Sequence, residues 1–85
     1  MYQVIKRDGK VADFSISKIA NAITKAFDAQ NKQYNTDIID FLALKVTADY
    51  QDKIENGRIG VEKIQDSVER VLVQAGYADV AKAYI

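Results

Sequence analysis

Strand-forming residues dominate two short runs near the N-terminus, separated by a polar segment. The first run covers residues 2–6, and the apolar pattern resumes over residues 11–14. Asp8 and Gly9 lie between them, and an Asp-Gly pair suits the positive φ angles of a tight hairpin turn. The sequence therefore predicts an N-terminal β-hairpin, which needs helices to cover one of its faces because an isolated hairpin is marginally stable.

The next segment, residues 16–29, places apolar side chains at every third or fourth position, which is the spacing of one helix face. Ser15 or Ser17 can cap the N-terminus of this helix. The polar residues 30–35 then interrupt the pattern. The expected apolar face consists of Ile19, Ala22, Ile23, Ala26 and Phe27.

A second helix is predicted over residues 37–55, with Asn35 or Thr36 as its cap. The expected apolar stripe consists of Ile38, Phe41, Leu42, Val46 and Tyr50. We expect Asn56 and Gly57 to end this helix, because both residue types tolerate the left-handed backbone conformation found at helix ends.

A third helix is predicted over residues 61–75, with Ile59 placed to pack on Ile64 as a hydrophobic staple and Gly76 as the stop signal. Residues 77–85 also look helical, but they end without a cap or stop signal. We therefore expect the chain to be a fragment cut inside a longer element.

These elements predict an α+β fold over residues 1–85, in which a small N-terminal β-hairpin packs on a bundle of about four helices. The 85 residues are 48% hydrophobic and 28% charged, which is typical of a folded domain. No apolar run is long enough to span a membrane, and the N-terminus lacks a signal-peptide pattern, so we expect a cytoplasmic location and no membrane partner. Because the chain has neither Cys nor His, we expect no catalytic site and no metal site formed by side chains.

Charge is distributed unevenly, although the net charge is zero. Residues 1–27 hold five bases and two acids, a net charge of +3, whereas residues 28–85 hold seven bases and ten acids, a net charge of −3. An anionic ligand is therefore expected near the first third of the chain. The four Gly residues are too scattered for either glycine-rich phosphate loop, so phosphate binding would depend on side chains.

Three basic residues are the candidate phosphate contacts. Lys6 and Arg7 lie at the predicted hairpin turn. The lysine offers a compact ammonium charge, and the arginine offers a planar guanidinium that can donate two parallel hydrogen bonds to a phosphate. Lys18 falls in the first turn of a predicted helix, where the helix dipole disfavours a cation unless an anion binds there as well. The alternative for each is a solvated surface charge. Gln65 and Glu69 lie one helical turn apart and can together line a groove.

Several segments resemble the motifs of the ATP-cone domain. Residues 4–9, V-I-K-R-D-G, followed by Phe14 and the Lys-Ile pair at 18–19, are similar to the hairpin and helix start of that family. Residues 59–69 resemble its second block and residues 76–85 its closing block. The resemblance covers nearly the whole chain. The sequence is most similar to the N-terminus of anaerobic ribonucleoside-triphosphate reductases.

The resemblance implies an allosteric role. ATP-cones of ribonucleotide reductases control overall activity, since bound ATP permits turnover and bound dATP suppresses it by changing the assembly state. The expected ligands are therefore ATP or dATP, with Mg²⁺ held mostly by phosphate oxygens and water. The expected partners are the rest of the parent reductase and, through the cone, other copies of the chain.

The resemblance also implies a nucleotide site. Its members by position are Val4, Lys6, Arg7, Lys18, Asn21, Val61 and Gln65. The three bases match phosphate contacts, and Val4 matches a hairpin position near the adenine. Val61 and Gln65 match positions that face the base, where aerobic reductases often have Thr and His. Asn21 is expected one turn below Lys18 on the same side of the helix.

Two other classes of protein fit parts of the sequence. A protein-interaction or oligomerisation module would use the apolar edge and the tyrosines, with the hairpin bases merely exposed. A nucleic-acid-binding regulator would use residues 1–27, but the acidic remainder and the lack of a contiguous basic stripe count against it. A repressor of reductase genes carries a cone behind a zinc ribbon that requires four cysteines, which this chain lacks. We therefore expect no nucleic-acid partner.

Overall fold

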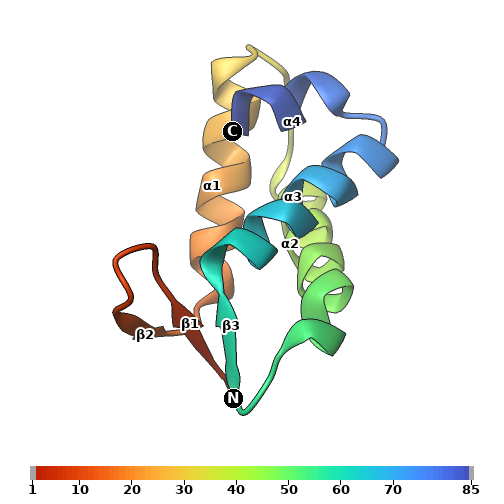
Figure 1. The fold of residues 1–85 in the computed structure, drawn as a ribbon. Helices are drawn as coiled ribbons and strands as arrows, with labels where there is room; N and C mark the ends of the chain where they lie inside the picture. Colours follow the sequence, from red (N-terminus) through yellow and green to blue (C-terminus); the bar gives the residue numbers. More distant parts are fainter. Residues whose placement is uncertain (1, 85) are drawn as a thin grey trace.

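The computed structural model describes residues 2–84 as a three-stranded sheet packed against four α-helices (Figure 1). The elements are β1 (Gln3–Ile5), β2 (Val11–Asp13), α1 (Ile16–Ala29), α2 (Thr36–Tyr50), a 3₁₀ turn (Gln51–Lys53), β3 (Arg58–Gly60), α3 (Val61–Gln74) and α4 (Ala78–Tyr84). The predicted α+β class is confirmed, with its N-terminal hairpin and its four helices. Ile85, the last residue of the predicted closing block, lies outside the described residues.

Strand β1 lies at the centre of the sheet, antiparallel to β2 and parallel to β3. Val4 is therefore paired with Ala12 on one side and with Ile59 on the other. The predicted Asp-Gly turn joins β1 to β2, with Gly9 at a φ of 85°. Ile59 is the buried middle residue of β3, a strand that the sequence did not predict. It also directly precedes Gly60, the N-cap of α3, so it keeps the position predicted for a hydrophobic staple with Ile64.

The prediction that the second helix extends to residue 55 was wrong, because α2 ends at Tyr50. Asn56 and Gly57 do not cap that helix. They form a two-residue turn, with φ values of 53° and 73°, between residues 55 and 58, whose backbones exchange two hydrogen bonds of 2.9 Å. Asn-Gly is the preferred sequence for this kind of turn, and here it leads the chain into β3.

The helix ends are only partly as predicted. Asn35 caps α2 by accepting a hydrogen bond of 2.8 Å from the backbone N–H of Ile38. Gly76, at a φ of 91°, ends α3. Ser15 occupies the N-cap position of α1, but its hydroxyl contacts the hydroxyl of Ser17 at 2.7 Å and caps no backbone group. The first turn of α1 is therefore left without a side-chain cap.

One apolar core joins all four helices to the sheet. The fully buried side chains include Ile23 and Phe27 of α1 and Tyr50 of α2. Phe41 was expected in the stripe of α2, yet it is 58% exposed, and Ile39 is buried instead. The core residues are Ile19, Ile23, Ala26, Phe27, Ile39, Leu42, Ala43, Val46, Tyr50, Ile59, Ile64, Val68, Val71, Leu72, Val80 and Ala81.

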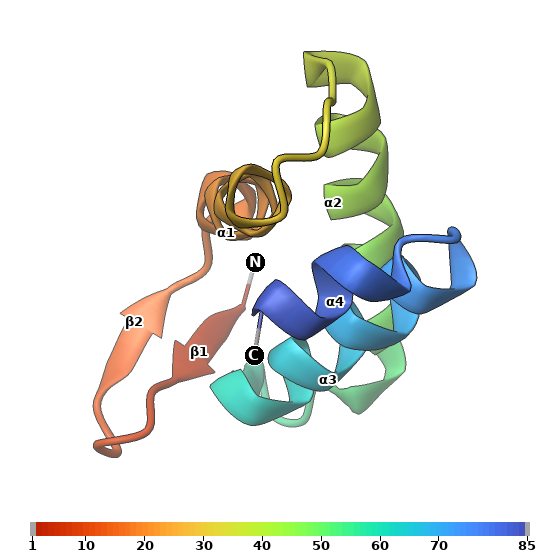
Figure 2. The same cartoon turned by 90° about the horizontal axis from the view of Figure 1, so that it is seen from above.

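The hairpin, the starts of α1 and α3, and the end of α4 lie close together. Helix α4 packs against both α1 and α3, and the hairpin projects beside the start of α1 (Figure 2). Strand β3 runs directly into α3, so the N-terminus of α3 begins at the edge of the sheet. None of the helices within residues 2–84 has the length and apolarity needed to cross a membrane.

Candidate functional site

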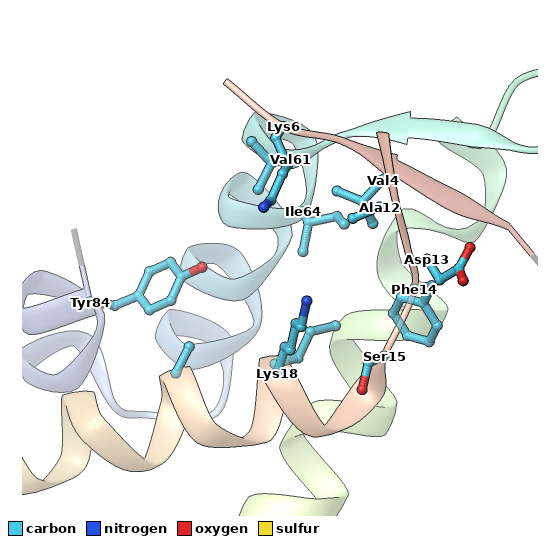
Figure 3. Close-up of a pocket in the computed structure, with 12 residues that line it drawn as sticks. Val4, Lys6, Ala12, Asp13, Phe14, Ser15, Lys18, Val61, Ile64 and Tyr84 are labelled. Atoms are coloured by element: carbon cyan, nitrogen blue, oxygen red, sulfur yellow. The ribbon is translucent and has the colours of Figure 1, made fainter. Parts of the chain in front are cut away.

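A largely apolar hollow of about 180 Å³ lies between the hairpin, the starts of α1 and α3, and the end of α4 (Figure 3). Its floor and walls are formed by aliphatic and aromatic groups from these elements. The apolar lining residues are Val4, Ala12, Phe14, Ile19, Ala22, Val61 and Ile64. The hollow can therefore take a flat, apolar group such as an aromatic ring.

Two lysines give this hollow its charge. Lys6 extends from the end of β1 and Lys18 from the first turn of α1, and the ammonium groups of both point into the same space (Figure 3). Neither lysine forms an ion pair with any residue from 2 to 84. The first turn of α1 carries no acidic residue, so the positive end of the helix dipole adds to the two charges. The combination attracts an anion.

Arg7 does not share this hollow. Its guanidinium donates a hydrogen bond of 2.6 Å to the Oε1 atom of Gln65 on α3. Both side chains line a neighbouring groove of about 300 Å³, together with Glu62, Asp66 and Glu69. The prediction that Gln65 and Glu69 line one groove is confirmed. The groove is acidic apart from Arg7, so the two adjacent bases of the hairpin turn face different environments.

Tyr84, near the end of α4, is a site residue that the sequence interpretation missed. It lines both the apolar hollow and the acidic groove. Burial raises the pKa of its hydroxyl, and Glu69 raises it further while Arg7 opposes the shift. No feature of the sequence indicates this role, because a tyrosine at a helix end is most often part of the edge of the core.

The structure brings together most, but not all, of the predicted site. Val4, Lys6, Lys18 and Val61 line the hollow, and Arg7 and Gln65 line the adjacent groove.

Asn21 lies elsewhere, in a hollow between α1 and α2 that Asp40 and Leu44 also line. Four positions after Lys18 the helix has completed just over one turn, so Ala22 faces the first hollow and Asn21 is rotated away from it.

Two ion pairs among residues 2–84 join segments outside the site. Lys32 contacts Asp79 at 2.8 Å, which joins the segment after α1 to the start of α4. Arg70 contacts Asp49 at 2.7 Å, which joins α3 to α2. The Arg70 hydrogen bonds lower the pKa of Asp49, and the Lys32 ammonium lowers that of Asp79. Within the part of the chain that the structure describes, no cluster of acidic side chains could hold a metal ion.

The chain is similar to known proteins over nearly its whole length. The family model described as "ATP cone domain" matches residues 2–85. The chain is 39% identical to ribonucleoside-diphosphate reductase subunit alpha of Chlamydia pneumoniae, over 96% of this chain and 8% of the relative. It is 37% identical to the anaerobic ribonucleoside-triphosphate reductase of Haemophilus influenzae, over 99% of this chain and 12% of the relative.

A third relative is the vitamin B12-dependent ribonucleoside-diphosphate reductase of Thermoplasma acidophilum, 42% identical over 98% of this chain and 11% of the relative. The chain thus spans 8–12% of the length of these reductases. The relatives include an anaerobic ribonucleoside-triphosphate reductase, the type that the sequence motifs most resembled. Since the family model covers residues 2–85, the chain belongs to the ATP-cone domain family.

Proposed function

We propose that this domain senses ATP and dATP and thereby controls the overall activity of a ribonucleotide reductase, without catalysing a reaction itself. The observation that carries the proposal is the convergence of the Lys6 and Lys18 ammonium groups on one apolar hollow at the uncapped start of α1. An adenine nucleotide combines a flat, weakly polar ring with a polyanionic chain, and the hollow offers surfaces for both.

The lining residues form two groups, one suited to the base of an adenine nucleotide and one suited to its phosphates. The apolar side chains of Val4, Val61 and Ile64 offer contact area for the base. The two lysines offer charge-assisted hydrogen bonds to phosphate oxygens. Mg²⁺ would be held by the phosphates and water, because the described residues supply no cluster of carboxylates suited to it.

The proposed mechanism is linkage between binding and assembly. ATP and dATP would favour different quaternary arrangements of the parent reductase, and the difference in their affinities for these states would shift the active population. No bond is broken in the domain. The partners are the rest of the reductase and other copies of the cone, and the expected location is the cytoplasm, where the nucleotide pools would be sensed.

Calorimetric titration of the 85-residue chain with ATP, dATP and adenosine tests the proposal. We expect both triphosphates to bind about a hundredfold more tightly than adenosine, because the lysines act on the phosphates. Equal affinity for adenosine would contradict phosphate recognition. A chain that binds no nucleotide but self-associates would instead be an interaction module.

A second test uses the parent reductase. Deleting residues 1–85 should leave turnover intact and remove both the inhibition by dATP and the dATP-driven change in sedimentation, with substrate choice fixed by a separate effector. A truncated enzyme inhibited by dATP as strongly as the intact one would refute the regulatory role.

A further inference from the structure

Tyr84 occupies the boundary between the two parts of the site. Of the residues from 2 to 84, it is the one that lines both the apolar hollow and the acidic groove. Lys6 and Lys18 lie on one side of this boundary, and Arg7 lies on the other. A ligand that extends from the hollow into the groove can therefore lie against the Tyr84 ring.

The hydroxyl of Tyr84 is available to such a ligand. It points toward the space that the two ammonium groups face (Figure 3), and it makes no hydrogen bond to any of residues 2–84. Since burial raises the pKa of this hydroxyl, it stays protonated at neutral pH and can donate a hydrogen bond. A ligand that fills the hollow displaces water from the hydroxyl, so a polar ligand atom at this place is favoured over an apolar one.

The position of Tyr84 depends on the docking of α4. Val80 and Ala81 of this helix are buried in the core, and Asp79 at its start is paired with Lys32. Tyr84 lies one turn beyond Val80, so the helix must be packed against α1 and α3 for the ring to line the site. Any ligand contact with the ring therefore favours the docked helix.

We propose that Tyr84 is a further ligand-contact residue, whose hydroxyl donates a hydrogen bond to the bound nucleotide and couples occupancy of the site to the docking of α4. This inference rests on the proposed nucleotide function. It adds a residue from the last helix to a site otherwise made by the hairpin, α1 and α3. Binding then stabilises α4 as well as the elements that hold the phosphates.

Tyr84→Phe tests the contact, because it removes the hydroxyl and keeps the ring. We expect ATP to bind this variant about 3- to 10-fold more weakly, the range for one neutral hydrogen bond, in a calorimetric titration. Tyr77→Phe is the matched control. Tyr77 packs its ring against Phe27 near the opposite end of α4 and lines neither part of the site, so its affinity for ATP should stay within about twofold.

Amide hydrogen exchange tests the coupling. ATP should slow the exchange of the α4 amides by about threefold or more in the unsubstituted chain, and by less in Tyr84→Phe. Unchanged affinity in Tyr84→Phe, or α4 exchange that ATP does not slow, would overturn the inference while leaving the nucleotide function standing. Failure of the unsubstituted chain to bind ATP would overturn both.

Discussion

The guanidinium of Arg7 and the carboxamide of Gln65 are joined by a hydrogen bond of 2.6 Å between residues 58 positions apart. The bond connects the hairpin turn to α3 and directs Arg7 into the acidic groove, while the preceding residue, Lys6, faces the apolar hollow. A phosphate that approaches Arg7 would either share the guanidinium with the Gln65 oxygen or displace it, because a guanidinium has five N–H donors. In the proposed function, the strength of this contact influences how readily a triphosphate binds.

Gln65→Glu should lower the affinity for ATP by about 1–2 kcal/mol. A carboxylate would hold the Arg7 guanidinium in a charge-assisted pair and would add negative charge to a groove that already contains Glu62 and Glu69. Calorimetry measures the change. Gln74→Glu, at the exposed end of α3, is the control and should have little effect, whereas equal losses in both variants would indicate a general charge effect.

Lys6→Ala and Lys18→Ala should each weaken ATP binding by about 1.5–3 kcal/mol, the range for hydrogen bonds to charged groups. Neither lysine has an ion-pair partner within residues 2–84, so the melting temperature without ligand should hardly change. Lys25→Ala removes the same charge from an exposed position of α1 and serves as the control. If the ligand-free variants unfold instead, the lysines have a structural role.

Tyr50→Phe should reduce the free energy of unfolding by about 1 kcal/mol. The hydroxyl of Tyr50 is hydrogen-bonded to that of Tyr2, and this pair joins α2 to the residue before β1. Burial raises the pKa of both hydroxyls, so both stay protonated and the bond persists at neutral pH. Urea denaturation measures the loss, and Tyr34→Phe, at a surface position 38% exposed, should cost far less.

Asp49→Asn should cost about 0.5–1 kcal/mol of stability at pH 7 and should flatten the acid side of the stability profile. Because Arg70 lowers the pKa of Asp49, the contribution of this carboxylate is present above its ordinary pKa of 3.8 and is lost as the pH falls through the lowered value. Denaturation at pH values from 7 down to 2 measures this dependence. Asp52→Asn is the exposed control, and a profile as steep in Asp49→Asn as in the unsubstituted chain would contradict the assignment.

Gly57→Ala should destabilise the domain by about 1 kcal/mol or more, because the φ of 73° at Gly57 disfavours any residue with a Cβ atom. An added Cβ would meet no atom within 4 Å, so the cost is conformational and not steric. Gly60→Ala is the comparison. Gly60 has an ordinary φ of −71° and equally open surroundings, so thermal unfolding should show a smaller loss there.

The helices could be predicted because each depends on a local pattern. The boundaries of α1 match the predicted 16–29, and α3 ends within a residue of its prediction, since Gly76 provides a local stop. The end of α2 could not be predicted. Whether Asn56 and Gly57 close a helix or a two-residue turn depends on β3, and β3 exists because β1 lies beside it.

The site could be predicted residue by residue but not in its arrangement. Positive charge near the N-terminus led to Lys6, Arg7 and Lys18, and a family motif carries no information on the direction of a side chain. Lys6 and Arg7 face different spaces, and Gln65 of α3 contacts Arg7 in the acidic groove. Tyr84 could not be found in this way, because its role depends on how α4 packs.

The parallel pairing of β1 with β3 also affects the order of folding. Two helices intervene between these strands, and closing such a long loop costs more entropy than forming the adjacent hairpin. Contacts between residues distant in sequence form slowly compared with the helices. The hollow needs the hairpin on one side and the start of α3 on the other, so a nascent or partly unfolded chain holds the lysines without the pocket. If the domain binds nucleotide as proposed, its affinity therefore requires the fully folded chain.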